Sequence, residues 1–257
     1  MNELPRRHVV TGIAGLSLAA LLADPLKLAA AAASLSDITI TTAGGRRVTG
    51  ALGVPVKTPA PAIVLVHEWW GLNQQIRGVA SQLTDLGYLS LAVDLYDGKV
   101  ASDPTTAKQY VGAVRPDQAI DTLTSWIDAL RQRSDCNGKL ATIGWCFGGG
   151  WSLRASLARP VDATVIYYGD VRPPATTLQA LKGPVLGHFG GLDQSITPPT
   201  VDAFEARMKQ LGKKATIYRY ADAKHAFANP TGQNYEAADA RQAWDRTVAF
   251  LKETIGS

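Results

Sequence analysis

Apolar and amphipathic stretches alternate along most of the chain. Short runs dominated by Val, Ile, Leu and Ala predict buried strands, and the segments between them carry apolar residues at helical spacing. The predicted strands are 62–67, 88–94, 140–144, 163–168, 184–189 and 215–220. The predicted helices are 75–86, 105–131 with an interruption near Arg115-Pro116, 151–157, 198–211 and 235–255. This alternation is typical of an α/β fold with a mostly parallel sheet and helices on both faces.

Two further strand-like runs precede this alternation. Residues 37–42 and 47–54 are joined by Gly44-Gly45, which predicts an antiparallel hairpin at an edge of the sheet. The chain has 257 residues, of which 46% are hydrophobic and 19% charged, as in ordinary globular proteins. Because there is no internal repeat and no linker rich in Pro, Gly or Ser, we expect residues 34–257 to form a single domain.

The first 33 residues have the layout of a signal peptide. Arg6 and Arg7 precede a mild apolar run over 11–23, and small residues follow at 29–33. The paired arginines and the weakly hydrophobic run resemble a twin-arginine signal. We therefore expect a periplasmic or secreted mature chain that begins near Ser34. The apolar run is short for a membrane-spanning helix, so we expect no stable membrane insertion after cleavage. The alternative is a plain amphipathic helix at the N-terminus.

The charged residues and cysteines exclude two classes of function. The formal net charge is +4, but the basic residues are scattered, whereas a nucleic-acid partner requires a clustered basic surface. The two cysteines, Cys136 and Cys146, are expected as free thiols, with Cys136 in a loop before Asn137-Gly138. No CxxC pair or Cys/His cluster has the spacing of a zinc site, so we expect no metal.

The most informative stretch is Gly144-Trp145-Cys146-Phe147-Gly148, which joins an apolar strand directly to a helix. Gly-x-Cys-x-Gly in this position has the layout of a nucleophile elbow, with cysteine in place of the more usual serine. The turn is so tight that its neighbours must lack side chains. The helix N-terminus behind it favours a thiolate and an oxyanion. The alternative is a buried cysteine in a glycine-rich turn.

A cysteine nucleophile needs a base, and the base needs an acid to orient it. We assign the base to His225, because its loop follows the last strand and lies at the same sheet edge as Cys146. His188 lies inside an apolar run and is expected in the core, whereas His67 ends a strand and could line the site. Asp193 follows the preceding strand and is the expected orienting acid, although a turn or capping role is the alternative. The order nucleophile, acid, histidine is that of α/β-hydrolases.

Glu68 and Trp69 follow the first parallel strand, where α/β-hydrolases build half of the oxyanion hole. We assign the two oxyanion donors to the backbone N–H groups of Trp69 and Phe147. Glu68 would then place a carboxylate near the thiol, where it disfavours the resting thiolate and can accept a proton. The alternative is a strand-end glutamate that pairs with Arg77.

Several aromatic residues adjoin these motifs. Trp70, Tyr96 and Phe227 are candidates for the walls of an apolar pocket, whereas Trp145, inside the elbow, is expected to pack between loops. Such walls would suit an apolar or aromatic acyl group.

Five motifs in this order resemble the dienelactone hydrolase family of the α/β-hydrolases, over residues 63–251. They are the Glu-x-x-Gly-x-Asn run at 68–73, Asp94-Leu95-Tyr96, the cysteine elbow, Gly-Gly-x-Asp at 190–193 and His-x-Phe at 225–227. The resemblance implies a Cys-Asp-His triad that hydrolyses a lactone or ester through a thioester on Cys146. It also implies that Glu68 modulates the ionisation of this cysteine.

The sequence also departs from the family. Family members hold a substrate carboxylate with arginines, and Asn229 stands at the place of one of them. The other has no clear replacement, since the 105–114 region contains only Lys108, with Arg115 beyond it. We expect a small-molecule ester or lactone substrate, no cofactor, and a monomer or homodimer. The alternatives are an acyltransferase or peptidase on the same fold, or a ligand-binding protein without turnover.

Overall fold

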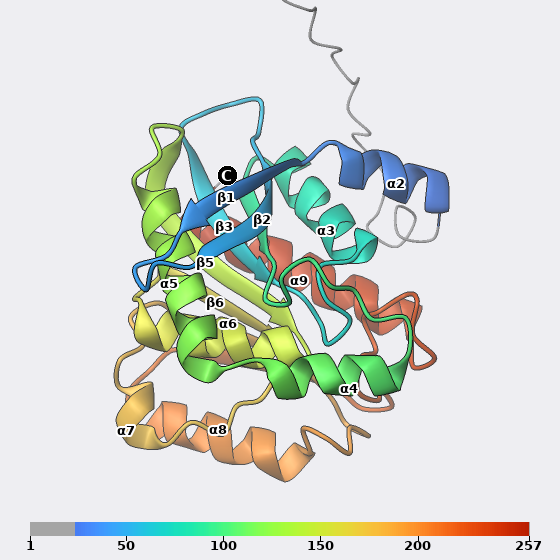
Figure 1. Cartoon of the computed structure of the whole chain (residues 1–257). Helices are drawn as coiled ribbons and strands as arrows, with labels where there is room; N and C mark the ends of the chain where they lie inside the picture. Colours follow the sequence, from blue (N-terminus) through green and yellow to red (C-terminus); the bar gives the residue numbers. More distant parts are fainter. Residues whose placement is uncertain (1–23, 257) are drawn as a thin grey trace, which may run out of the picture.

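The computed structural model describes residues 24–256 and contains one sheet of eight strands (Figure 1). The strands are β1 (Ser36–Thr41), β2 (Arg47–Gly53), β3 (Ala60–Val66), β4 (Leu89–Val93), β5 (Cys136–Trp145), β6 (Ala163–Tyr167), β7 (Val185–Gly190) and β8 (Ala215–Tyr220). Their order across the sheet is β1-β2-β4-β3-β5-β6-β7-β8. The β1–β2 and β2–β4 pairs are antiparallel, and the pairs from β4 onward are parallel. The predicted edge hairpin and mostly parallel sheet are confirmed.

Helices cover both faces of this sheet. They are α2 (Pro25–Ala33), α3 (Gln74–Asp85), α4 (Pro104–Ala113), α5 (Pro116–Arg131), α6 (Phe147–Ala158), α7 (Ala175–Leu178), α8 (Pro198–Gln210) and α9 (Ala237–Ile255). Alternate residues of β3 enter different cores, because successive side chains of a strand point to opposite faces. Ile63 and Leu65 pack in the core that contains residues of α3 and α9. Val64 and Val66 pack with residues of α5 and α6. The α/β-hydrolase fold is confirmed.

Three local differences separate this structure from the predicted elements. Strand β5 begins at Cys136, so this residue opens a strand instead of lying in a loop. Helix α6 begins at Phe147, directly after the predicted nucleophile, because Gly148, Gly149 and Gly150 adopt helical turns despite their low helix propensity. The four-residue helix α7 was not predicted.

Only the end of the predicted signal peptide belongs to the described residues. Residues 25–33 form α2, and Asp24 caps this helix by accepting hydrogen bonds from the backbone N–H groups of Leu26 and Lys27. Leu28 is buried in the same core as α3. The paired arginines and the apolar run over 11–23 lie outside the described residues. Within residues 24–256, no helix is long and apolar enough to cross a membrane.

Candidate active site

Cys146 lies at a sharp turn between β5 and α6. Its backbone has φ 53° and ψ −117°, a left-handed conformation that L-residues rarely adopt. A Cβ atom at Gly144 would lie 2.0 Å from the carbonyl oxygen of Gly148. One at Gly148 would lie 2.2 Å from the carbonyl oxygen of Val66. Only glycine fits at both positions, so the predicted elbow and its steric reason are confirmed.

Cys146, His225 and Asp193 form a chain of hydrogen bonds across three loops. His225 Nε2 lies 3.1 Å from Cys146 Sγ, and His225 Nδ1 lies 2.7 Å from Asp193 Oδ2. Asp193 is fully buried and accepts further hydrogen bonds from the backbone N–H groups of Ser195 and Ile196. The structure therefore brings together the three residues that the sequence assigned to a triad.

The charges of the three hydrogen-bonded residues Cys146, His225 and Asp193 stabilise one another. Burial opposes the imidazolium of His225, but its hydrogen bonds to Asp193 and Cys146 outweigh burial and raise the pKa to about 10. Burial also acts against the Asp193 carboxylate, yet its bonds to His225 and to backbone N–H groups lower the pKa of Asp193. At neutral pH the imidazolium therefore donates one N–H to Asp193 and directs the other at the sulfur.

The two assigned oxyanion donors lie at the ends of different elements. Phe147 is the first residue of α6, so its backbone N–H has no carbonyl partner within the helix. The positive end of the α6 dipole lies at the same point. Trp69 follows β3, the strand adjacent to β5, and its side chain lines the same cavity as Cys146.

Glu68 is a buried carboxyl group at the edge of the site. Its Oε1 accepts a hydrogen bond from the Tyr168 hydroxyl at 3.1 Å, and its Oε2 accepts one from Asn229 Nδ2 at 2.5 Å. Burial raises the pKa of Glu68 to about 7, although these bonds and the nearby His225 act in the opposite direction. The alternative pairing with Arg77 is wrong, because Arg77 lies 2.8 Å from Asp37.

Sequence reasoning missed the roles of Tyr168 and Asn229. It included Tyr168 in a strand, but β6 ends at Tyr167 and Tyr168 turns with φ 38° so that its hydroxyl reaches Glu68. From the sequence, Asn229 stood out only because it takes the place of an arginine of the family. For Tyr168 the available signal was position, since a polar residue directly after a parallel strand lies at the edge that carries the other motifs.

The two other described histidines have structural partners. His188 is fully buried between the hydroxyls of Tyr220 and Thr247, as predicted, and burial lowers its pKa to about 3. His67 is also fully buried. Its Nε2 accepts from the Leu95 N–H, so Nδ1 carries the proton that is donated to the Glu68 carbonyl. Neither ring is placed to act on the thiol of Cys146.

The dienelactone hydrolase family model matches residues 48–255. The chain belongs to the dienelactone hydrolase family. Carboxymethylenebutenolidase from Pseudomonas putida is 30% identical over 228 residues, which cover 83% of this chain and 94% of the relative. Protein usf from Aquifex pyrophilus is 28% identical over 221 residues, with 82% and 95% covered.

Solved structures of this family have the same architecture. A Klebsiella pneumoniae protein assigned to the dienelactone hydrolases gives a TM-score of 0.75 at 25% identity, covering 85% of this chain and 99% of that one. A dienelactone hydrolase-like promiscuous phosphotriesterase from metagenomic libraries gives 0.76 at 23% identity, covering 87% and 100%. The second likeness concerns the fold alone. The family and the fold together identify this chain as a hydrolase of the dienelactone hydrolase type.

A cavity of about 900 Å³ opens over Cys146 and His225. Its apolar walls are Trp69, Trp70, Pro104, Val111, Val114, Pro116, Phe147, Trp151 and Ile196. The assignment of Trp70 to the pocket is therefore confirmed. Phe227 is a correction, because it is fully buried in the core, where its ring packs against Tyr168 and Tyr220.

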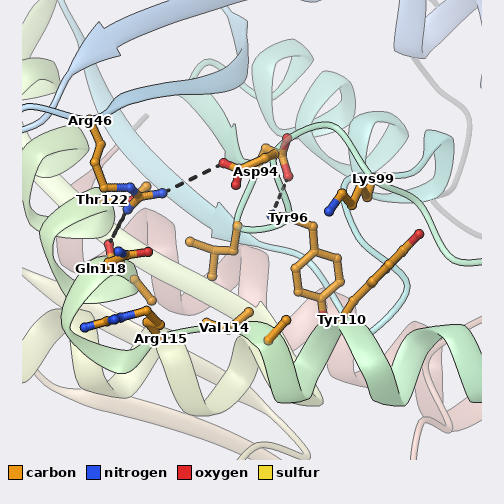
Figure 2. Close-up of a pocket in the computed structure, with 13 residues that line it drawn as sticks. Arg46, Asp94, Tyr96, Lys99, Tyr110, Val114, Arg115, Gln118 and Thr122 are labelled. Atoms are coloured by element: carbon orange, nitrogen blue, oxygen red, sulfur yellow. Dashed lines mark hydrogen bonds and ion pairs between the residues drawn. The ribbon is translucent and has the colours of Figure 1, made fainter.

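Tyr96 is a second correction. It does not line the cavity over Cys146 but a separate, small cavity of about 100 Å³ (Figure 2). Its ring packs edge-on against His67 and tilted against Phe147, so it supports the site from behind. Trp145 has a packing role, as predicted, but its buried ring stacks on Tyr167 of the neighbouring strand β6 and not between loops.

The small cavity is lined by three basic side chains, of which only Arg115 was weighed as a substrate-binding residue from the sequence. Arg46, Lys99 and Arg115 line it, as Figure 2 shows. Arg115 pairs with Asp117 at 3.1 Å, and Arg46 donates to Thr122 at 3.2 Å. Within residues 24–256, no group of three or more His, Cys, Asp and Glu side chains could hold a metal ion.

Proposed function

We propose that this chain hydrolyses carboxylic esters or lactones through a thioester on Cys146. The observation that carries the proposal is the hydrogen-bonded chain of Asp193, His225 and Cys146 at the elbow. Membership of the dienelactone hydrolase family supports the same bond type.

The reaction follows from the positions of these groups. Cys146 Sγ attacks the carbonyl carbon of the substrate, and the oxygen that becomes negative is stabilised by the N–H groups of Phe147 and Trp69. The C–O bond of the ester then breaks, and His225 Nε2 gives its proton to the leaving oxygen. Water attacks the thioester with His225 as base, which releases the acid and restores the sulfur.

Glu68 regulates the charge next to this sulfur. With a pKa raised to about 7, it exchanges its proton close to neutral pH. A Glu68 carboxylate disfavours the thiolate by repulsion, and protonation of Glu68 removes that repulsion. Tyr168 and Asn229 hold both carboxyl oxygens in place.

Trapping the acyl-enzyme tests the mechanism. The protein is mixed with a 4-nitrophenyl ester, quenched in acid and digested, and the peptides are weighed by mass spectrometry. The acyl mass is expected on the peptide that contains Cys146 and not on the one that contains Cys136, the other thiol. Alkylation should abolish activity in step with modification of Cys146. Loss of activity that follows Cys136 instead would contradict the proposal.

Two competing reactions share these intermediates. An acyltransferase or a peptidase would also use the elbow, and peptidases such as the acylaminoacyl peptidase of Pyrococcus horikoshii share only the fold, at 13% identity. Adding alcohols and amines to the assay separates the options. A hydrolase keeps the free acid as main product, whereas an acyltransferase diverts the acyl group to the added nucleophile.

We also propose that the chain is exported by a twin-arginine-type signal. The support is the pattern of Arg6 and Arg7 followed by the apolar run over 11–23. Fractionation of cells that express the full chain, compared with an Arg6→Lys/Arg7→Lys variant, tests this proposal. Export of the variant at the level of the wild type would contradict a twin-arginine route.

A further inference from the structure

The cavity over Cys146 is built mainly from apolar side chains. Trp69 and Trp70 pack edge to face at 4.9 Å, and Phe147 packs against Trp151 at 6.0 Å in the same cavity. With about 900 Å³ available, the space exceeds what a small acetyl group fills. The walls therefore favour a bulky apolar substituent.

Two side-chain amides of this cavity, those of Asn229 and Asn234, already have partners. Asn229 Nδ2 donates to Glu68, while Asn229 Oδ1 accepts from the N–H and hydroxyl of Thr231. Asn234 Nδ2 donates to the carbonyl of His225 at 3.0 Å. If either amide turned to bind a substrate, it would leave its present partner without a hydrogen bond. An unpaired buried polar group costs about 1–3 kcal/mol.

Among the described residues that line the cavity, Arg154 is the one lysine or arginine. Its guanidinium lies 5.0 Å from the ring centre of Trp151, and its Nη2 lies 3.3 Å from Asp170 Oδ2. Asp170 also lines the cavity and accepts from Arg172 Nε at 2.7 Å through its other oxygen. The Asp170 carboxylate thus supplies Arg154 with a counter-ion from within the protein.

Apart from Arg172, which pairs with Asp170, the cations near this corner face another space. Arg46, Lys99 and Arg115 line the small cavity of Figure 2, together with the carboxylates of Asp94 and Asp97. A carboxylate bound over Cys146 would therefore meet the acidic groups Glu68 and Asp170. The cations there are already paired, Arg154 with Asp170 and the His225 ring with Asp193 and Cys146.

We infer that the substrate of this site is a neutral ester or lactone with a bulky apolar group, and that the Asp170–Arg154 pair sets this specificity. The inference rests on the proposed hydrolysis at Cys146 and names its substrate class. Asp170 acts by pairing with the Arg154 guanidinium. A carboxylate-bearing substrate then loses its hydration without gaining an unpaired cation in the cavity. A neutral aryl or branched alkyl group instead removes apolar wall area from water.

The test uses two substrates that differ in one ring substituent, which is neutral in the first and negatively charged in the second. They are the 4-nitrophenyl esters of 4-methylphenylacetic acid and of 4-carboxyphenylacetic acid, whose rigid rings keep the carboxylate away from the ester carbonyl. The wild type is expected to show a kcat/KM at least about 10-fold higher for the methyl-substituted ester than for the carboxylate-substituted one, because an uncompensated charge is costly to desolvate. A higher KM for the carboxylate ester should carry the difference.

Asp170→Asn tests the specificity role directly. It keeps the side-chain shape but removes the counter-ion, so Arg154 becomes available to the carboxylate ester. The methyl-to-carboxylate ratio of kcat/KM is expected to fall by about 10-fold, the range of one charge-assisted hydrogen bond. Adding Arg154→Gln in the same chain should restore the ratio. Circular dichroism and thermal unfolding check that both variants are folded.

Asp162→Asn is the matched control. Asp170 follows β6, whereas Asp162 precedes the same strand at the opposite sheet edge. Asp162 pairs with Lys139 at 3.1 Å. It changes the net charge equally but should leave the substrate ratio unchanged. Equal or faster turnover of the carboxylate ester by the wild type would overturn the inference and leave the Cys146 mechanism intact. Turnover of both esters that persists in Cys146→Ala would instead overturn the proposed function.

Discussion

Two neighbouring cavities differ in the charged residues that line them. The cavity over Cys146 is large and apolar, and its single described arginine is paired with Asp170. The small cavity behind Tyr96 is polar and holds Arg46, Lys99 and Arg115 (Figure 2). The difference shows that basic residues close to an active site in sequence need not face it. In the proposed reaction, the charges over Cys146 come from His225, its partner Asp193 and Glu68, whereas Asp170 acts on the choice of substrate.

The largest effect should come from removing the sulfur of the apolar cavity. Cys146→Ala is expected to lower kcat for aryl esters by about 10⁴-fold or more, because a triad without its nucleophile retains only residual stabilisation. Cys136→Ala, at the start of β5, removes the other thiol and should change kcat less than about 2-fold, the range of distant surface changes. Wild-type rates in Cys146→Ala would show that the cavity is not the catalytic one.

Asp193→Asn should have the next largest effect. The neutral amide no longer stabilises the imidazolium of His225, and a loss of about 10²–10⁴-fold in kcat is expected by comparison with other triads. The pKa of His225, raised to about 10 in the native protein, should fall towards its ordinary value. Initial rates and NMR titration of the His225 ring measure both effects. Asp222→Asn changes an exposed carboxylate in the loop before His225 and should leave both unchanged.

Glu68→Gln sharpens the role of charge in the apolar cavity. The folded pKa of about 7 exceeds the ordinary value of 4.5 for a glutamate, so the native state binds more protons than the unfolded chain between these pH values. The contribution of Glu68 to stability is therefore most favourable below about pH 4.5 and declines as pH rises to about 7. As pH rises from 5 to 8, the free energy of unfolding of the variant should increase by about 1–3 kcal/mol relative to that of the wild type. Urea unfolding at both pH values measures this, with exposed Glu253→Gln as the control that should show no gain.

The smallest effect is expected in the polar cavity. Arg115→Gln breaks an exposed pair with Asp117, and such pairs contribute about 0–1 kcal/mol. Both the methyl-to-carboxylate ratio and kcat should change less than about 2-fold, within the range of ordinary surface substitutions. A selective loss of activity towards the carboxylate ester would show that Arg115 reaches the substrate, and the separation of the two cavities would then be wrong.

Much of the candidate site followed from local sequence patterns. The elbow was predictable because Gly144 and Gly148 leave no room for a Cβ, and because an apolar strand ends directly before Cys146. Asp193 and His225 were predictable because each follows a strand of a parallel sheet, whose carboxyl ends meet at one edge. The misplacements of Tyr96 and Phe227 have a common cause, since an aromatic residue beside a motif can pack behind the site as well as line it.

The sequence by itself determined the α/β alternation, the edge hairpin and the three residues of the hydrogen-bonded chain, because strand periodicity and turn sterics act over a few residues. Only the tertiary structure decided which groups hold Glu68 and which carboxylate occupies Arg154. Tyr168 and Asn229 reach Glu68 across 100 and 161 residues of chain. Such contacts depend on strand order and on the direction of each turn, which no local pattern records.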